Sequence, residues 1–366
     1  MPNHKNEIFK NLFVLEAANN HWGDLARGKK IIRDYAAVVR QNRVKAAIKF
    51  QFRDVDNFIH EDFKGNQDIR YIKKTEATKM EVAQYRELGE AVRKSGCIPM
   101  ATPFDEKSVD LCVQLDFPII KVASSDINDW PLLERIAFHR KPVIISTGGA
   151  SENSIDQVVA FFEKRDIELA INHCVSLYPS TDSQLELAQI SYLKNRYPDH
   201  VIGFSTHEMT SWDVSMHISY ALGARTWERH IDIDYENVPV APYCSLPEQV
   251  DTWFKAFHKS KEMLGTAYSE RRSIADPEVR YLDALVRGVY AKQDMEVGYE
   301  FSSATFERDF QLAVPLRRGQ ISTREINNGL VLTQALKAGE PVTIDHINGP
   351  YSENSNLRKL IEERGV

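Results

Sequence analysis

The chain has 366 residues, 43% of them hydrophobic, and a formal net charge of −6. One hydrophobic core stops growing near ~250–300 residues, so this length predicts one large domain and one small one. Lys and Arg are scattered, which argues against a nucleic-acid partner. No apolar stretch reaches the ~18 residues of a membrane span, and the N-terminus lacks the apolar segment of a signal peptide. The four cysteines have no metal or redox spacing. Together these features predict a cytoplasmic protein with reduced thiols.

Eight short apolar runs alternate with amphipathic stretches from the start of the chain to about residue 265. The predicted strands are Leu12–Ala17, Ala46–Phe52, Ile98–Thr102, Ile119–Ser124, Val143–Thr147, Leu169–Val175, Val201–Ser205 and Thr226–Ile231. The spacing predicts helices over Met80–Lys94 and Asp156–Glu163, the second capped by Ser151 or Asn153. Eight such units in ~250 residues predict a closed (β/α)₈ TIM barrel, with residues 1–265 as the catalytic domain.

Polar and charged residues stand at the end of every predicted strand. They are Glu16, Lys49, Gln51, Thr102, Lys121, Ser124, Ser146, Thr147, His173, Ser176, Ser205, His207, Glu228 and His230. Active sites of TIM barrels lie at the C-terminal ends of the strands, where eight loops converge. Eight consecutive polar endings are hard to explain by packing alone, so the pattern predicts an active site at this rim.

Beyond the barrel, the pattern changes. Residues 266–284 are charged, contain a proline and are expected to form a linker. Residues 285–350 hold a weak internal repeat, in which short predicted strands flank tight turns at Gly298 and Gly339. This repeat predicts a compact β-rich domain that needs support from a neighbour. Residues 351–366 are left as a C-terminal tail.

The rim residues suggest how small anions are bound. Lys49 and Lys121 supply positive charge, and the Ser and Thr hydroxyls supply oriented hydrogen bonds, a combination suited to a phosphate and a carboxylate. For any single serine, capping of the strand end is the simpler explanation. The whole set favours binding.

Two histidines and two carboxylates complete the rim. His207 and His230 follow neighbouring strands, and two imidazoles so placed suit one divalent ion with open coordination positions. His21 and His173 have either a structural or a functional role. Glu16 and Glu228 are candidates for a general acid, a general base or a stabiliser of positive charge. The alternative for these carboxylates is an ion pair with Lys49 or Arg229.

Eight motifs along the barrel resemble the sialic acid (N-acetylneuraminate) synthase family, including its spore-coat-polysaccharide type. They are Glu16-Ala-Ala-Asn-Asn-His-Trp-Gly, Ile48-Lys-Phe-Gln, Ala101-Thr-Pro-Phe-Asp, Lys121-Val-Ala-Ser-Ser-Asp, Ile145-Ser-Thr-Gly, His173-Cys-Val-Ser-Leu-Tyr-Pro, Gly203-Phe-Ser-Thr-His-Glu and Glu228-Arg-His. The C-terminal domain resembles the antifreeze-like (SAF) domain of that family, so the resemblance covers nearly the full chain.

The resemblance implies an enzyme that condenses phosphoenolpyruvate with an amino sugar, giving a nonulosonic acid and phosphate. It implies a Mn²⁺ or Mg²⁺ ion and a domain-swapped homodimer. It places Glu16 beside the reacting carbons, and His207 and His230 as metal ligands. Further implied roles are phosphoenolpyruvate binding by Thr102, Lys121, Ser124, Ser146 and Ser205, with Ser176 where the family usually has Asn, and sugar contacts by Lys49, Gln51, Asn66 and Tyr178.

The chain departs from the family pattern in the sugar half of the site. The family's Ser-Asp-His is here Ser205-Thr206-His207, and Ala241 stands where a sugar-contacting Asp is usual. The Arg-Pro-Gly turn of the SAF domain is replaced, so the sugar-contacting arginine is expected to be Arg317 or Arg318. Two alternatives stay open: another phosphoenolpyruvate-dependent 3-deoxy-sugar-acid synthase, which lacks the SAF domain, and a non-catalytic sugar-binding or polysaccharide-assembly homologue, which has no need for a costly cluster of charges.

Overall fold

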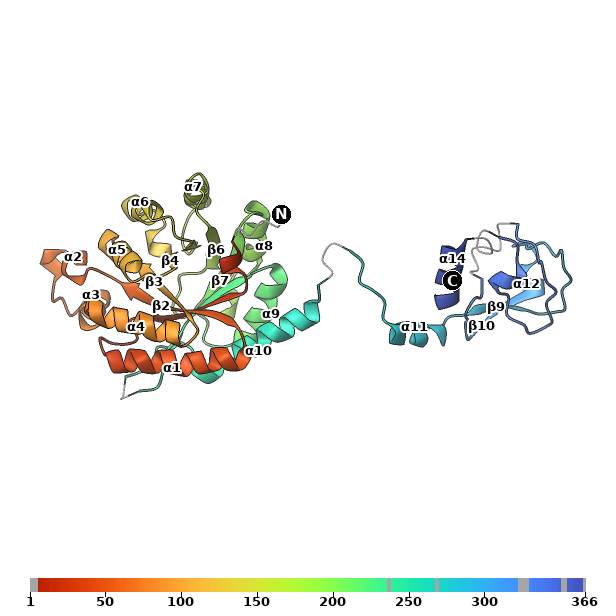
Figure 1. Ribbon diagram of the computed structural model, residues 1–366, viewed down its shortest axis with the longest axis horizontal. Coiled ribbons are helices and arrows are strands. Elements are labelled where there is room, and N and C mark those ends of the chain that lie inside the picture. Colours follow the sequence, from red (N-terminus) through yellow and green to blue (C-terminus); the bar gives the residue numbers. More distant parts are fainter. Residues whose placement is uncertain (1–5, 236–237, 267–269, 322–328, 350–353, 365–366) are drawn as a thin grey trace. The chain divides into compact units, whose positions relative to one another are not determined.

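The computed structural model describes residues 6–235, 238–266, 270–321, 329–349 and 354–364. The chain divides into two compact units, Met1–Gly265 and Thr266–Val366 (Figure 1). The first is called the barrel and the second the C-terminal unit.

The barrel is a closed ring of eight parallel strands in sequence order, with β8 paired to β1. The strands are β1 (Leu12–Ala18), β2 (Lys45–Phe52), β3 (Ile98–Pro103), β4 (Ile119–Val122), β5 (Val143–Ser146), β6 (Leu169–Cys174), β7 (Val201–Thr206) and β8 (Thr226–His230). The TIM-barrel prediction is confirmed, and each predicted strand lies within two residues of the observed one. Ser124 lies past β4, in a 3₁₀ turn that spans Ser124–Asp126.

Helices surround the ring of strands (Figure 1). The main ones are α1 (Leu25–Asn42), α4 (Val82–Lys94), α5 (Glu106–Gln114), α6 (Trp130–Phe138), α7 (Glu152–Glu163), α8 (Ala188–Arg196), α9 (Trp212–Leu222) and α10 (Pro247–Leu264), and two shorter ones, α2 (Val55–Phe58) and α3 (Arg70–Ala77), follow β2. Side-chain caps fix several starts: Asp24 accepts from Ala26 N at 2.7 Å, and Ser151 accepts from Ser154 N at 3.1 Å. Ser151, rather than Asn153, is therefore the cap of α7.

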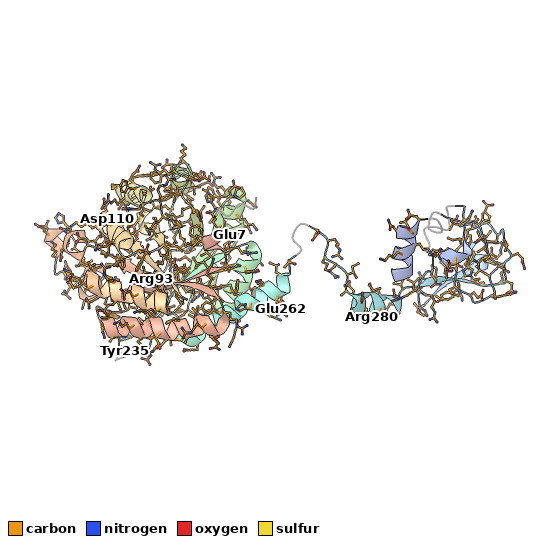
Figure 2. The ribbon with its side chains drawn as sticks, viewed as in Figure 1. Glu7, Arg93, Asp110, Tyr235, Glu262 and Arg280 are labelled. Carbon is orange, nitrogen blue, oxygen red and sulfur yellow. The ribbon has the colours of Figure 1, made fainter. Side chains whose placement is uncertain are left out.

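Surface contacts also join neighbouring helices. Arg93 on α4 and Asp110 on α5, both labelled in Figure 2, make such contacts. Arg93 donates to the Asp116 carbonyl after α5 at 2.9 Å, and Asp110 pairs with Arg135 on α6 at 2.7 Å. None of the helices within the described ranges combines the length and apolar character needed to cross a membrane.

Alternation along the strands separates two apolar cores. Outward residues such as Phe13, Ile48 and Ile171 pack in one large cluster with the helices. Phe9, which precedes β1, and inward strand residues form a second cluster at the base of the barrel. The strand residues are Leu12, Val14, Ala47, Met100, Ile119, Ile144, Ala170 and Val201. Because strand side chains alternate, the next inward positions toward the strand ends are polar, and Glu16, Lys49 and Lys121 lie directly above this apolar floor.

The C-terminal unit has its own core around an antiparallel pair, β9 (Gly288–Ala291) and β10 (Phe310–Ala313). The two segments of the predicted repeat pair with each other, since Met295 N donates to Leu336 O at 2.8 Å and Leu336 N to Met295 O at 3.0 Å. Both predicted turn glycines have positive φ, 89° at Gly298 and 86° at Gly339. The other elements are α11 (Asp276–Asp283), within the expected linker, α12 (Phe306–Asp309), a 3₁₀ turn at Ile344–His346, and α14 (Ser355–Arg364).

Candidate active site

Four charged side chains meet inside the barrel above its apolar floor. Glu16, Lys49, Lys121 and Glu228 come from β1, β2, β4 and β8, and none is more than 6% exposed. Lys49 forms an ion pair with Glu16, and its Nζ lies 3.5 Å from Glu228 Oε1. Lys121 Nζ lies 3.9 Å from the same oxygen. The ion pair between Glu16 and Lys49, which the sequence left as an alternative to a functional role, is therefore part of the site itself.

Each carboxylate of this cluster has one oxygen without a hydrogen-bond partner in the described part of the chain. Glu16 Oε1 and Glu228 Oε2 are buried and have no hydrogen-bond partner among the residues that the structure describes. Burial alone would raise the pKa of Glu228, but Lys121 and Lys49 outweigh it and hold this pKa below its usual value. A buried ionised carboxylate with an open oxygen is costly to fold. The cluster thus has unused capacity to interact with positive charge or with a donor.

The two lysines each contact a hydroxyl. Lys49 Nζ donates to Thr102 Oγ1 at 2.8 Å, and Lys121 Nζ donates to Ser146 Oγ at 2.6 Å. Burial lowers the pKa of Lys49 to about 7, with Glu228 opposing the shift. Two cations with adjacent hydroxyls form the anion-binding combination that the rim pattern predicts.

Ser124 and Ser176 converge on Gly148, which follows β5. A Cβ atom at Gly148 would lie 2.2 Å from Ser176 Oγ and 2.9 Å from Ser124 Oγ. Ser124 Oγ also accepts from Gly148 N at 3.1 Å. Ser205 Oγ, on β7, donates to Glu228 Oε1 at 3.4 Å. The glycine therefore leaves room for hydroxyls from the ends of β4 and β6, the strands on either side of β5, to face one position.

His207 and His230 lie side by side after β7 and β8, with ring centroids 5.5 Å apart. His207 Nδ1 lies 3.0 Å from the Val175 carbonyl, so Nδ1 carries the proton and Nε2 is left as the potential ligand. Burial lowers the pKa of His207 to about 4 and that of His230 well below its usual value. Neutral imidazoles are metal ligands, so this donor pair fits a divalent ion. Within the described residues, no group of three or more His, Cys, Asp or Glu side chains meets the geometry of a metal site.

Two tyrosines cover the histidine pair. The Tyr178 ring lies 3.9 Å from the His207 ring and 5.3 Å from the ring of Tyr243. Tyr243 in turn lies 5.2 Å from His230. Tyr243 belongs to the loop after β8 at residues 240–245, two residues after the altered position Ala241. This side of the site therefore presents aromatic surface.

The remaining predicted residues have more local contacts. Gln51 Oε1 accepts from Arg53 Nη1 at 3.1 Å. Asn66 Oδ1 accepts from the backbone N–H of Asp68 and Ile69 at 2.9 and 3.1 Å, so it shapes its own loop before α3. Gln51 continues the inward positions of β2 above Lys49, whereas the structure gives Asn66 no contact with the charged cluster.

The two uncertain histidines have structural contacts. A ring nitrogen of His173 lies 2.8 Å from the Leu185 carbonyl, and the ring stacks on Phe204 in the outward layer. His21 is fully buried, and its Nδ1 accepts from Gly23 N at 3.1 Å. Neither contact involves the four-charge cluster.

Arg317 and Arg318 lie in an exposed turn of the C-terminal unit. Gln320 N donates to Arg317 O at 3.1 Å, and the buried Gln320 Nε2 donates to Val289 O at 2.8 Å. Both arginines therefore extend from a turn that is anchored to the core of this unit.

Three residues near the site were missed by sequence reasoning. Arg53 stacks 3.7 Å from the Phe104 ring at the mouth. Asn172 and Cys174 are buried on the inward face of β6, and the Asn172 amide has no partner in the described part of the chain. Strict alternation from Ala170, applied to the predicted strand, would have identified the last two.

Known proteins share this fold and this sequence pattern. A model of the NeuB family matches residues 40–268, more than half of the chain. The chain belongs to the NeuB family. A solved structure assigned to spore coat polysaccharide biosynthesis, protein E of Chromobacterium violaceum ATCC 12472, matches with a TM-score of 0.87 and 34% identity, covering 93% of this chain and all of that one.

Two curated relatives are similar at about the same level. "Uncharacterized protein MJ1065" of Methanocaldococcus jannaschii is 30% identical over 78% of this chain and 80% of its own length. The N-acetylneuraminate-9-phosphate synthase of Homo sapiens is 30% identical over 60% of this chain and 62% of its own length. Membership of the NeuB family makes the chain a phosphoenolpyruvate-condensing, nonulosonic acid type of synthase.

Proposed function

We propose that this NeuB-family synthase joins phosphoenolpyruvate to the open-chain aldehyde of an N-acylated hexosamine. Carbon 3 of phosphoenolpyruvate attacks the aldehyde carbon, water adds at carbon 2, and phosphate leaves with cleavage of its C–O bond. The observation that supports this most is the buried cluster of Glu16, Lys49, Lys121 and Glu228, with two carboxylate oxygens left open. A protein that only bound sugar or scaffolded other proteins would have no use for so costly an arrangement.

The cations and hydroxyls form the phosphoenolpyruvate half of the proposed site. Lys121 and its neighbour Ser146 neutralise an anionic group of the substrate, and Thr102 supports Lys49 in the same task. Ser124 and Ser176, which face each other across Gly148, donate to the phosphate, and Ser205 completes the set. Loss of the charged contact in Lys121→Ala would cost about 1.5–3 kcal/mol, seen as a higher KM for phosphoenolpyruvate.

Glu16 and Glu228 act on the reacting carbons. Carbon 2 of phosphoenolpyruvate gains positive charge when carbon 3 attacks, and an open carboxylate oxygen stabilises that charge. Glu16 is suited to this role because its β1 position is in register with Lys49 on one side and His230 on the other. Glu228, which both lysines hold ionised, keeps Lys49 and Lys121 oriented when no substrate is bound.

His207 and His230 would hold the Mn²⁺ or Mg²⁺ ion. When bound, such an ion polarises the aldehyde oxygen as a Lewis acid. The Val175 carbonyl fixes the protonated nitrogen of His207 and so keeps the other nitrogen available. Calorimetric titration with Mn²⁺ tests the assignment: His207→Ala and His230→Ala should each abolish binding, and full binding by both variants would remove these residues from the metal site.

The aromatic surface near the histidines supports an unusual acceptor. Gln51 and Asn66 offer polar contacts, but Ala241 provides no side-chain acceptor for a sugar hydroxyl, and Tyr178 and Tyr243 add apolar area. A site that does not hydrogen-bond a hydroxyl tolerates a deoxy sugar. We therefore expect a 2,4-diacetamido-trideoxy hexose to be a better acceptor than N-acetylmannosamine.

The decisive test is phosphate release from phosphoenolpyruvate with a panel of acceptors. Phosphate should be released from phosphoenolpyruvate when the acceptor is an N-acylated hexosamine. It should not be released when the acceptor is a four- or five-carbon aldose phosphate. Release only with the aldose phosphates would favour a seven- or eight-carbon acid synthase. No release with any acceptor, by a chain that binds the sugars, would favour a non-catalytic homologue.

The C-terminal unit, proposed to be an SAF domain, would complete the sugar half in a domain-swapped homodimer. Arg317 or Arg318, exposed on its anchored turn, would reach the acceptor bound in a partner's barrel. A mixture of a His207→Ala chain with a chain in which both arginines are Ala tests this under subunit exchange. Activity approaching half per dimer supports action between subunits, and no recovery means that each barrel uses its own arginines.

A further inference from the structure

A buried ion pair lies directly behind the two histidines. His207 and His230 face the barrel interior, so their neighbours in sequence, Glu208 and Arg229, face outward into the layer between strands and helices. Both side chains are 1% exposed, and Arg229 Nη1 lies 2.8 Å from Glu208 Oε1. Glu208 directly follows His207, and Arg229 directly precedes His230. The pair thus joins the two histidine-bearing segments from behind.

Every polar atom of the Glu208 carboxylate is engaged. Oε1 accepts from Arg229 and also from Ser215 Oγ on α9 at 2.6 Å. Oε2 accepts from the Thr206 hydroxyl. Position 206 is in register with Arg229, so the carboxylate that the family resemblance expects at this position would lie beside the arginine. Here Glu208 supplies that carboxylate instead, and Thr206 holds it.

Arg229 also contacts the backbone and the neighbouring loop. Its Nη2 donates to the Glu208 carbonyl at 2.8 Å, and its Nε donates to Ser245 Oγ at 2.8 Å. Ser245 N in turn donates to the His230 carbonyl at 2.9 Å. One guanidinium therefore connects the end of β7, the end of β8 and the 240–245 loop that carries Tyr243.

Burial of this ion pair fixes both side chains but has a cost in desolvation free energy. The guanidinium lies 5.8 Å from the rings of both Trp212 and Trp253, away from water. Buried ion pairs gain little net stability over packed apolar residues, because desolvation offsets the attraction. Groups behind metal-binding histidines, by contrast, fix the orientation of those ligands.

We propose that Glu208 and Arg229 are positioning residues, which set the separation and orientation of His207 and His230 and anchor the Tyr243 loop beside them. The proposal rests on the proposed function, since it treats the two histidines as metal ligands. It assigns neither residue a contact with substrate. The ion pair is expected to act on metal affinity and on acceptor binding together, because Arg229 connects the histidines and the loop, and to leave the phosphoenolpyruvate half unchanged.

The test compares the full-length wild-type chain with Glu208→Gln and with the double variant Glu208→Gln/Arg229→Met, which leaves no unpaired buried charge. The dissociation constant for Mn²⁺ is measured by calorimetry, and the KM of each substrate by phosphate release. Loss of a group that orients metal ligands weakens metal binding about 10- to 100-fold. We expect weakening of this size in both variants, a raised acceptor KM, and a phosphoenolpyruvate KM within about twofold of wild type.

Asp232→Asn is the matched control. Asp232 pairs with Arg27 at 2.7 Å, and both side chains are 2% exposed. This buried pair joins α1 to the segment after β8 and does not contact Glu208. The control should lose stability while keeping the Mn²⁺ affinity within about threefold, since a purely structural loss leaves the ligand geometry unchanged.

Four outcomes decide the matter. Weaker Mn²⁺ binding by both variants but not by Asp232→Asn supports the proposal. A single Arg229→Lys variant, which keeps the positive charge, should accordingly bind Mn²⁺ more tightly than the double variant does. A folded double variant with wild-type Mn²⁺ affinity overturns the positioning role and leaves the proposed function intact. Equal weakening by Asp232→Asn also overturns it, because any buried pair would then have the same effect. A wild-type chain that binds no Mn²⁺ overturns both the metal assignment and the positioning role.

Discussion

The barrel and the C-terminal unit both bury carboxylates, but they satisfy them differently. In the C-terminal unit, Asp309 has no exposed surface. Its Oδ1 accepts from Gln293 Nε2 and from Arg308 Nε, each at 2.7 Å. Its Oδ2 accepts from Arg308 Nη2 at 2.8 Å and from the Tyr299 hydroxyl. In the barrel, Glu16 and Glu228 each keep one buried oxygen without a partner in the described residues.

The difference distinguishes a structural carboxylate from a functional one. A buried acid whose oxygens are all bonded contributes to stability, and removing it leaves its donors unpaired. A buried acid with an open oxygen lowers stability, so another requirement must maintain it. The same residue type can therefore be assigned to packing or to chemistry from its hydrogen bonds.

The largest expected effect is on turnover in Glu16→Gln. The amide keeps the shape of the side chain but cannot stabilise positive charge at carbon 2. Loss of one such electrostatic contact lowers kcat by about 10²–10³-fold. The free energy of unfolding should fall by less than the about 3–5 kcal/mol that loss of one partner usually costs a buried ion pair, because Lys49 Nζ keeps Glu228 Oε1 at 3.5 Å. Steady-state kinetics and urea unfolding measure the two quantities.

Glu90→Gln, an exposed substitution on α4, is the control for the chemical change from Glu to Gln. It should alter neither quantity. If Glu16→Gln kept wild-type turnover while losing several kcal/mol of stability, Glu16 would belong with Asp309 as a structural acid.

The next effect concerns substrate binding in Gly148→Ala. The new methyl group would meet Ser176 Oγ at 2.2 Å. The two serines must then move apart. Overpacking of this kind costs about 1–3 kcal/mol, and every ~1.4 kcal/mol is tenfold. The KM for phosphoenolpyruvate should therefore rise by roughly 10- to 100-fold, with the acceptor KM unchanged. A raised acceptor KM alone would place Ser124 and Ser176 in the sugar half.

The sequence predicted the barrel well because its signal is local. Eight apolar runs, each ending in polar residues, give both the fold and the position of the site, and alternation orients Glu16 and Lys49 inward. The internal repeat likewise indicated Gly298 and Gly339 as turns. These features depend only on spacing along the chain.

The contacts between strands were beyond the reach of the sequence. Glu208 and Arg229 are 21 residues apart and meet only because β7 and β8 are neighbours with Thr206 opposite Arg229. The sequence instead offered Arg229 as a partner for Glu16 or Glu228, which is wrong, because alternation places it on the other face of the strand. The orientation of the Asn66 side chain could not be predicted either. Asn66 lies in a loop, which lacks the regular spacing that orients side chains in a strand or helix.

A smaller effect, on stability alone, is expected for Asp309→Asn in the C-terminal unit. The amide cannot accept all the hydrogen bonds from Arg308, Gln293 and Tyr299, and a buried donor left without a partner costs about 1–3 kcal/mol. Amide hydrogen exchange over residues 288–313 of the full chain should speed up accordingly. Unchanged protection in this segment would show that Asp309 contributes no more than an exposed acid.

The smallest expected effect is the acid sensitivity of that same carboxylate. The hydrogen bonds from Arg308 lower the pKa of Asp309 to about 2, against the opposing effect of burial. Between about pH 4 and pH 2 the unfolded chain therefore binds more protons at this position than the folded chain does, so stability rises with pH in this window. The contribution is complete above about pH 4 and is lost as the pH falls to about 2. Arg308 is 69% exposed, and solvent screening limits the gain to about 1–2 kcal/mol.

Protection of residues 288–313 from exchange, followed from pH 6 to pH 2, measures this loss in the wild-type chain and in Asp309→Asn. The wild type should lose part of its protection, and the variant, which has no carboxyl group to protonate at this position, should lose less by the same 1–2 kcal/mol. Parallel losses in both chains would assign the acid sensitivity of the C-terminal unit to other groups. The charge of Asp309 would then not stabilise the C-terminal unit, although both of its oxygens are hydrogen-bonded.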